Sequence, residues 1–392
     1  MNIKPADRLK HFPVYLFDAL DQQKVEQEAK GVDVIDLSVG DPDRPTPKYI
    51  VEALREAVLN PDTHHYPSYK GLPAFRKAVA QWYKSQYGVD LDPDTEVMSV
   101  IGSKAGMSGL PLALVNPGET VLVPDPCYPA YLPGIVTAGG EVHFMPLFES
   151  NDFLPDLNDV PEEVRRRAKL MILNFPSNPT ASICTLDYFK EVVAFAQKYE
   201  IIVAHDAPYS EMMFDGNRQP SFLEAPGAKE VGIEFHSMSK TFNMSGWRCA
   251  FAVGNAAVIG ALGKLKSNLD MGIFEPIQYA AIAALTGSMD FTHEMCGVYQ
   301  RRRDVLLQGL ARLGWKPRKN PATFFVWTPV PEQGTPSGEF AAKALQKAGV
   351  LITPGAGFGK GGEGYVRIAL TVEEDRMREV VDRFEKAGLK YV

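Results

Sequence analysis

Short apolar runs that alternate with helical patterns constrain the fold of this chain more strongly than any other feature. The 185–199 stretch predicts a helix, because Leu186, Phe189, Val193 and Ala196 recur at helical spacing. Further helices are expected at 49–58 and 73–87. Nearly continuous apolar runs predict strands at 97–101, 120–123, 142–145, 170–173 and 201–204. Such runs are typical of parallel strands covered by helices on both faces, so we predict an α/β fold with a mostly parallel sheet.

The pattern changes after Gly287. Beyond it we expect helices at 292–313 and 338–348, and strands at 323–327, 350–353 and 365–370. A final helix follows Thr371, whose spacing to Glu374 matches a capping box. We therefore expect an N-terminal arm with part of a small domain at 1–45, a large domain at 46–287 and a small α+β domain at 288–392.

Charge and cysteine content argue against several classes of protein. The 392 residues include 41 basic and 48 acidic ones, with a net charge of −7 and no long basic block, so we expect no nucleic-acid partner. The four cysteines form no C-x-x-C pair, which predicts neither a metal site nor a disulfide framework and favours a cytoplasmic location. The first 11 residues lack the apolar core of a signal peptide, and no apolar run reaches the ~20 residues that span a membrane.

One short polar segment lies between two apolar runs, 231–235 and 249–253, and it contains Ser237, Ser239, Lys240 and Arg248. A lysine buried in apolar surroundings loses its proton readily, and a neutral amine is a nucleophile suited to Schiff-base chemistry. The two hydroxyls and the arginine fork are suited to holding a phosphate. The segment thus suggests a site for pyridoxal 5'-phosphate (PLP), although a polar connection with a solvated lysine fits the same residues.

Other segments could supply the remaining parts of such a site. Asp206 follows a predicted strand and could face the pyridine nitrogen of the cofactor, with Tyr209 within reach of the ring hydroxyl. The alternative is that Asp206 is a turn former or a helix cap. Ser103 and Lys104 stand where a strand and a glycine turn lead into a helix, which is a ready anion site.

Three further residues have both a functional and an ordinary interpretation. Asn178 lies in a proline-rich loop after a strand, so it is either a ligand group or part of a turn. Tyr128 could lie flat on a cofactor ring or belong to the core. Arg367 alternates with apolar neighbours on a predicted strand, and it is either a bidentate clamp for a carboxylate or one half of a salt bridge.

Several tempting motifs do not support other functions. The 357–362 stretch matches G-x-G-x-x-G, but a predicted strand follows it where a dinucleotide site requires a helix, so we expect a loop. His64 and His65 lack a third ligand nearby, and His293-Glu294 lacks the second histidine of a zinc protease. The 301–303 arginine run is expected to be a solvated or salt-bridged helix face.

Taken together, these residues resemble the class I/II aminotransferases of PLP fold type I. The pieces occur in the order of that family over essentially the whole chain: Gly40, Tyr66, Ser103-Lys104, Tyr128, Asn178-Pro179-Thr180, Asp206 with Tyr209, Ser237-x-Ser239-Lys240, Arg248 and Arg367. The resemblance implies a large PLP-binding domain with a mostly parallel seven-stranded sheet, a smaller α+β domain, and a homodimer whose interface completes the sites. It also implies that L-amino acids and 2-oxo acids are the substrates.

The same resemblance assigns roles to the residues. Lys240 binds the cofactor covalently and moves the proton, Asp206 pairs with the pyridine nitrogen, and Tyr128 stacks on the ring. Asn178 and Tyr209 hold the ring hydroxyl. The phosphate is held by residues of one subunit and by a tyrosine from its neighbour, namely Ser103, Lys104, Ser237, Ser239, Arg248 and Tyr66. The substrate is held by Arg367, the Gly40 backbone, Asn178 and Tyr15.

Within the superfamily, the 15–17, 33–47, 65–71, 234–237 and 240–248 stretches resemble the LL-diaminopimelate aminotransferases, which makes LL-2,6-diaminopimelate the first expected donor and 2-oxoglutarate the acceptor. Ala105, Gly109 and Met271 depart from that group's pattern, so donors such as alanine, aspartate or methionine stay open. A carbon–sulfur β-lyase on the same fold is a second alternative. A regulatory protein would need an added DNA-binding segment, for which this chain has no spare residues.

Overall fold

The computed structural model describes residues 1, 3–12, 16–332 and 334–391. Its main sheet has seven strands in the order β2-β8-β7-β6-β5-β3-β4. The strands are β2 (Val97–Val100), β3 (Thr120–Asp125), β4 (Glu141–Pro146), β5 (Ala168–Asn174), β6 (Ile202–Asp206), β7 (Gly232–Ser237) and β8 (Ala250–Gly254). All neighbours pair in parallel except β8, which is antiparallel to both β2 and β7. The predicted α/β fold with a mostly parallel sheet is confirmed.

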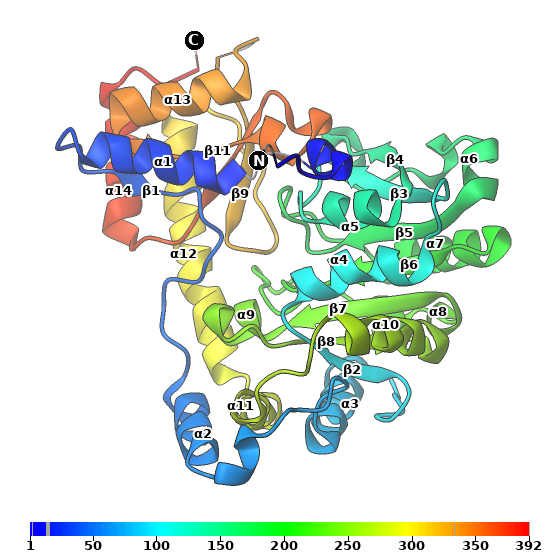
Figure 1. Cartoon of the computed structure of the whole chain (residues 1–392). Coiled ribbons are helices and arrows are strands. Elements are labelled where there is room, and N and C mark those ends of the chain that lie inside the picture. Colours follow the sequence, from blue (N-terminus) through cyan, green and yellow to red (C-terminus); the bar gives the residue numbers. More distant parts are fainter. Residues whose placement is uncertain (2, 13–15, 333, 392) are drawn as a thin grey trace.

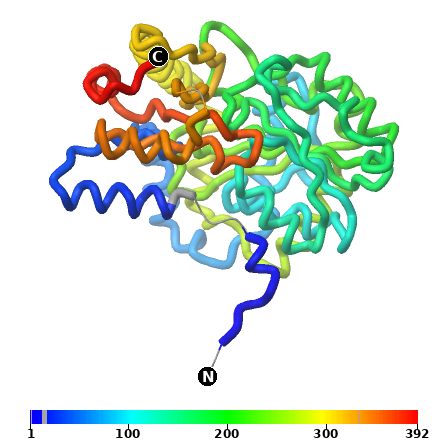
Figure 2. The backbone as a smooth tube through the Cα atoms, turned by 90° about the horizontal axis from the view of Figure 1, so that it is seen from above, coloured from blue at the N-terminus to red at the C-terminus, as the bar shows by residue number. Residues whose placement is uncertain are grey.

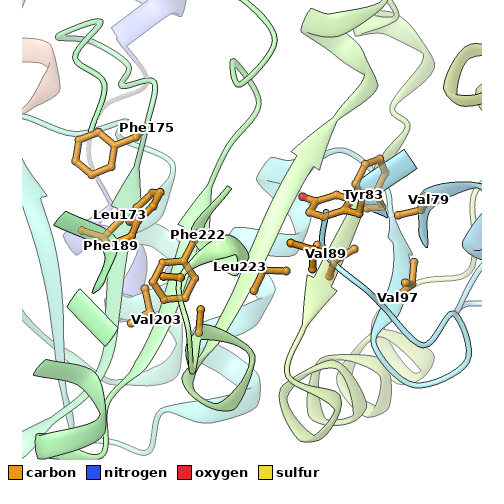
Figure 3. Close-up of a cluster of buried hydrophobic side chains, with 14 of the residues drawn as sticks. Val79, Tyr83, Val89, Val97, Leu173, Phe175, Phe189, Val203, Phe222 and Leu223 are labelled. Atoms are coloured by element: carbon orange, nitrogen blue, oxygen red, sulfur yellow. The ribbon is translucent and has the colours of Figure 1, made fainter. Parts of the chain in front are cut away.

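Helices cover both faces of this sheet (Figure 1). On β5, Leu170 and Ile172 face one layer while Met171 and Leu173 face the other, as the two-residue period of a strand requires. The first layer contains α4 (Ser103–Leu114), α5 (Tyr131–Ala138) and α10 (Ala256–Leu269). The second contains α3 (Pro73–Tyr87), α7 (Leu186–Tyr199) and α11 (Glu275–Thr286). Figure 3 shows part of this second core, where Phe189 and Phe222 pack beside Leu173 and Val203.

A buried carboxylate ties the strands that lead to the candidate site. Glu234 on β7 accepts hydrogen bonds from the Tyr83 hydroxyl (2.6 Å), the Ser221 hydroxyl (2.8 Å) and the Phe222 amide (2.8 Å). Its other contact is the ring of His205 on β6, at 2.7 Å from Nδ1. The Phe175 amide donates to Nε2 of that ring, so Nδ1 carries the proton and donates to Glu234. The ends of β5, β6 and β7 are therefore held in one arrangement.

A second, smaller domain packs around an antiparallel sheet of order β11-β12-β9 and a short parallel pair β1-β10. Its strands are β1 (Ile35–Asp36), β9 (Phe325–Pro329), β10 (Val350–Leu351), β11 (Thr353–Pro354) and β12 (Tyr365–Ala369). Its helices are α12 (Asp290–Arg312), α13 (Ser337–Ala348) and α14 (Glu374–Lys386). Figure 1 shows α12 running from this domain towards the larger one.

The remaining helices are shorter or lie near the N-terminus. They are α1 (Leu16–Glu28), α2 (Lys48–Val58), α6 (Glu162–Arg167), α8 (Ala228–Val231) and α9 (Met238–Thr241). The first residues extend away from the rest of the chain (Figure 2). In the described part of the chain, no helix is long and apolar enough to cross a membrane, and no group of three or more His, Cys, Asp or Glu side chains could hold a metal ion.

One prediction of local structure was wrong. The capping box at Thr371 does not form, because α14 begins at Glu374 and the Thr371 hydroxyl is directed at the Val39 carbonyl oxygen instead. The arginine run is salt-bridged, one of the two predicted alternatives, but only Arg301 is at the surface, because Arg302 and Arg303 pair with carboxylates while fully buried. By contrast, the 357–362 stretch is a loop with short 3-10 turns, as predicted.

Candidate active site

A cavity of about 380 Å³ opens where the carboxyl ends of the parallel strands meet the smaller domain. Most of the residues that the sequence singled out line it: Gly40, Ser103, Lys104, Tyr128, Asn178, Asp206, Tyr209, Ser237, Ser239, Lys240, Arg248 and Arg367. They come from positions spread over more than 300 residues of sequence. The convergence of a lysine, a carboxylate, hydroxyls and two arginines makes this cavity the candidate active site.

Lys240 lies on α9, directly after β7, and its amine points into the cavity. The Nζ atom donates to the Gly40 carbonyl oxygen at 2.8 Å and lies 4.0 Å from Asp41 Oδ1. Burial lowers the pKa of Lys240 to about 8, with Arg248 and Arg367 adding to the effect and Asp41 opposing it. Roughly one Lys240 amine in ten is therefore neutral at pH 7, far more than at the ordinary pKa, and the neutral amine is the form that attacks a carbonyl carbon.

Asp206, the last residue of β6, is the buried carboxylate of the site. Its Oδ2 accepts a hydrogen bond from the Tyr131 hydroxyl at 2.8 Å, whereas Oδ1 is buried without a hydrogen-bond partner. Burial raises the pKa of Asp206 to about 6, despite the hydrogen bond from Tyr131 and the nearby His205. An unpaired buried carboxylate oxygen is costly unless a ligand completes it, and a protonated pyridine nitrogen is a suitable donor. This orphaned oxygen shows that the residues present fit PLP.

Another part of the cavity is suited to an anion. Helix α4 begins at Ser103, and the first amides of a helix have no intrahelical acceptor. The Arg248 guanidinium lies so close to Gly102 that a side chain at Gly102 would occupy its space. Gly102 also has a φ of 79°, a conformation that favours glycine. The Ser237 and Ser239 hydroxyls line the same cavity, so donors and cations converge where a phosphate would fit.

Arg367 on β12 is held rigidly at the side of the cavity near the smaller domain. Its Nη1 donates to Asn178 Oδ1 at 2.8 Å, and its Nη2 donates to the Ser38 carbonyl oxygen at 2.6 Å. The guanidinium carbon lies 4.2 Å from the ring centroid of Phe325. Burial lowers the pKa of Arg367 to about 10. A cation in such a desolvated place binds a substrate carboxylate strongly.

Aromatic side chains form other walls of the cavity. Tyr128 is partly buried, and its ring meets that of Tyr131 edge to face with centroids 5.7 Å apart. Tyr209 is buried, and burial raises the pKa of its hydroxyl, so it stays a proton donor at neutral pH. A Cβ atom at Gly40 would lie 2.6 Å from Phe325 Cζ, so the close approach of this ring requires glycine there.

One predicted residue that the structure describes does not line this cavity in the single chain, and another lies outside the described residues. Tyr66 does not reach it and is 88% exposed. Tyr15 lies outside the described residues. The sequence interpretation also missed lining residues, namely Asp21, Val39, Tyr131, Asn174, Pro208, Ser245 and Phe325. Tyr131 follows Tyr128 by three residues, and this helical spacing is the local signal that could have predicted both rings on one side of the chain.

The raised pKa of Asp206 predicts a pH-dependent effect on stability. The folded pKa of about 6 exceeds the usual 3.8, so ionisation of this group costs stability as pH rises from about 4 to 6, and the full cost persists at pH 7. We expect Asp206→Asn to raise the free energy of unfolding of the cofactor-free protein at pH 7 by about 2 to 3 kcal/mol. Urea unfolding at pH 7 and near pH 4 tests this, because the gain should shrink at the lower pH. An equal gain at both values would contradict it.

Comparisons with known proteins agree with this chemistry. Residues 32–384 match the family model of aminotransferase class I and II. The chain therefore belongs to the class I and II aminotransferases, enzymes that use PLP to transfer an amino group from an amino acid to an oxo acid. The predicted family, fold type and cofactor are confirmed.

Particular relatives narrow the comparison further. The LL-diaminopimelate aminotransferase of Syntrophobacter fumaroxidans is 52% identical over 381 residues, which are 97% of this chain and 98% of that protein. The enzyme of the same name from Moorella thermoacetica is 52% identical over 384 residues, 98% of each chain. The substrate-bound BacF structure from Bacillus subtilis matches with a TM-score of 0.96 and 42% identity, over 100% of this chain and 99% of its own.

Proposed function

We propose that this aminotransferase takes its amino group from LL-2,6-diaminopimelate and gives it to 2-oxoglutarate, a step of lysine biosynthesis. The orphaned Asp206 Oδ1 in the same cavity as Lys240 carries the transaminase assignment. The choice of donor is supported by relatives that are 52% identical in sequence over nearly the full chain and whose names specify this substrate.

PLP, when bound, accepts the amino group of the donor and passes it to the acceptor. In our proposal Asp206 lies against the pyridine nitrogen and keeps it protonated, with Tyr131 holding the carboxylate in place. Ser103, Lys104, Ser237, Ser239 and Arg248 hold the phosphate, while Tyr128 covers one ring face and Asn178 and Tyr209 contact the ring hydroxyl. Lys240 would hold the cofactor covalently between turnovers. Once the donor amine has displaced it, the freed Lys240 amine would take the proton from the donor α-carbon and deliver it to the cofactor carbon next to the transferred nitrogen. Its lowered pKa supports this role as a base near neutral pH.

We further propose that Arg367 clamps the α-carboxylate of both substrates, with the Gly40 backbone beside it. Replacement of Arg367 by Lys keeps the charge but removes the planar fork. We expect KM for the amino donor and for the oxo acid to rise together by about 10- to 100-fold. Steady-state kinetics with each substrate varied in turn measures this, and equal melting temperatures of the two holoenzymes would exclude a folding defect. Unchanged KM values for both substrates would remove Arg367 from this role.

We also propose that the enzyme is a homodimer. Exposed apolar side chains gather around the 61–68 segment and the start of α11, including Tyr66, Met271 and Phe274. The two segments touch, since the rings of His64 and Phe274 lie 5.8 Å apart. A patch of this kind supports an interface, and Tyr66 would then reach the neighbouring subunit's phosphate site. The molar mass in solution and the activity of mixed dimers test this arrangement.

The domain division and the location of the enzyme are also proposals. The division into an arm at 1–45, a large domain at 46–287 and a small domain at 288–392 is supported by the separate hydrophobic cores of the two sheets. The pairing of β1 with β10 supports the assignment of part of the arm to the small domain. A cytoplasmic location is supported by four buried thiols, as expected in a reducing compartment.

A donor screen tests the substrate directly. The PLP form of the enzyme is mixed with single amino acids in the absence of any oxo acid, and its conversion to the pyridoxamine form is followed by absorbance. We expect LL-diaminopimelate to convert it faster than alanine, aspartate or methionine. If one of those three is the faster donor, the proposed substrate is wrong while the reaction class stands.

A further inference from the structure

A second cavity, of about 470 Å³, lies between the C-terminal end of α3, the 210–219 segment and the N-terminal half of α12. Among the described residues, it shares no lining side chain with the active-site cavity. Its volume is typical of sites that bind small molecules. None of its side chains has a part in the transamination proposed above, so the cavity needs a separate explanation.

The two acidic side chains that line this second cavity differ in how they are paired. Asp215 is fully engaged, since it lies 2.6 Å from Arg303 and 3.0 Å from Lys319, and the hydrogen bond from Arg303 lowers its pKa to about 2. In the described structure, Glu211 has a single side-chain donor, the Tyr87 hydroxyl, at 2.6 Å from its Oε1. No described lysine, arginine or histidine forms an ion pair with it. Glu211 is therefore the acid of this cavity that lacks a cation.

The surroundings of Glu211 favour a positively charged partner. Burial raises the pKa of Glu211, although the Tyr87 hydrogen bond and the positive charges of His293 and Arg218 oppose this effect. An ammonium group beside the carboxylate would offset the cost of holding its charge away from water. The acceptor also has a defined position, because the Tyr87 ring packs against that of Tyr83 with centroids 5.2 Å apart.

Groups suited to a carboxylate line the same cavity. Arg218 Nη2 donates to Glu224 Oε1 at 2.8 Å, and the guanidinium carbon lies 5.8 Å from the centroid of the Tyr87 ring. A guanidinium has several N–H donors in a planar fork, so Arg218 can bind a ligand carboxylate while it keeps this contact. His293, an exposed residue of α12, supplies a further nitrogen. The cavity thus presents an acceptor for an ammonium together with donors for a carboxylate.

We infer that this cavity is a second binding site, separate from the active site, for a free α-amino acid, whose ammonium pairs with Glu211 and whose carboxylate pairs with Arg218 and His293. An amine alone would leave the donors of Arg218 unused, and a carboxylic acid alone would be repelled by Glu211. A molecule with both groups satisfies both sides of the cavity. The site goes beyond the proposed function, because it takes no part in the transfer of the amino group.

The test uses holoenzyme in which borohydride has fixed PLP to the protein, so that added amino acids cannot exchange with the cofactor. The protein amino acids are added one at a time at millimolar concentration, and the melting temperature is recorded. Calorimetric titration then gives the dissociation constant of the one that stabilises most. We expect at least one to bind, and Glu211→Gln to raise its dissociation constant about 10- to 100-fold, because the charge-assisted bond to the ammonium is lost. Analogues of that amino acid without the α-ammonium or the α-carboxylate should bind more weakly.

Two variants serve as controls for this titration. Glu191→Gln removes one acidic charge from the exposed face of α7, outside the cavity, and should leave the dissociation constant unchanged. Arg367→Lys changes the active site and should also leave it unchanged. The amide introduced by Glu211→Gln can still accept the Tyr87 hydrogen bond, and an unchanged melting temperature without ligand would show that the fold is retained.

Three results would overturn the assignment of this second site. The first is that no amino acid binds the reduced holoenzyme. The second is that Glu211→Gln binds as tightly as the wild type, or that Glu191→Gln weakens binding equally. The third is that Arg367→Lys abolishes binding, since the ligand would then lie in the active site. Each of these results leaves the proposed transamination standing, because turnover is measured independently.

Discussion

Replacement of Lys240 by alanine should lower turnover by about 10⁴-fold or more, because the variant loses both the nucleophile and the base of the reaction. The folded state should survive the change. Burial lowers the pKa of Lys240 to about 8, so its protonated form costs stability at pH 7, and the cofactor-free variant should unfold at the same or a higher temperature than the wild type. Coupled assays of turnover and thermal unfolding of the same preparations measure the two effects.

Lys240→Arg provides the complementary control. It keeps a cation in place, but a guanidinium stays protonated and cannot act as nucleophile or base, so turnover should fall by a similar factor. Undiminished transamination in either variant would refute the role of Lys240. A large loss of thermal stability in the alanine variant would show that the residue is needed for the fold and would weaken the catalytic interpretation.

The second large effect is expected at Arg302, on stability. Its side chain is fully buried and donates to both carboxylate oxygens of Asp43, at 2.8 and 2.9 Å, and to the Leu370 carbonyl oxygen at 3.0 Å. Arg302→Met should lower the free energy of unfolding by about 3 kcal/mol, because Asp43 keeps only the Tyr299 hydroxyl as a side-chain donor and the Leu370 carbonyl oxygen loses the Arg302 hydrogen bond. Since Asp43 lies in the loop that begins at Gly40, the variant should also bind substrates more weakly. Denaturant unfolding of the holoenzyme measures the loss.

Arg301→Met is the control from the same arginine run. Arg301 is 61% exposed, and its ion pair with Glu374 lies at the surface, where such pairs contribute about 0 to 1 kcal/mol. Its replacement should therefore change the free energy of unfolding by less than about 1 kcal/mol. Equal losses in the two variants would contradict the distinction between the buried and the exposed arginine.

Local patterns predicted much of the secondary structure, and tertiary pairing accounts for the rest. Helix α3 spans Pro73–Tyr87, the predicted range, because its apolar positions and its proline start are local signals. The antiparallel direction of β8 could not be predicted, since a strand buried on both faces is apolar whichever way it runs. The burial of Arg302 was missed because its partner, Asp43, is 259 residues away in sequence.

The residues of the site likewise divide into those with a local sequence signal and those whose contacts depend on the tertiary fold. The places of Lys240, Asp206 and the serine hydroxyls in the cavity could be predicted because each residue stands after a strand or at the start of a helix. The hydrogen bond from Tyr131 to Asp206 and the contact of Arg367 with Asn178 join residues 75 and 189 positions apart, so neither has a local signal. Asp21 was overlooked because an acidic residue on an exposed helix has no distinguishing pattern.

The most direct test of the central claim locates the cofactor on the chain. The purified protein is incubated with PLP, reduced with borohydride, digested and analysed by peptide mass spectrometry. We predict a single modified peptide that carries the added mass on Lys240. Modification of another lysine of the cavity, such as Lys104, or the absence of any modified peptide would contradict the assigned active site.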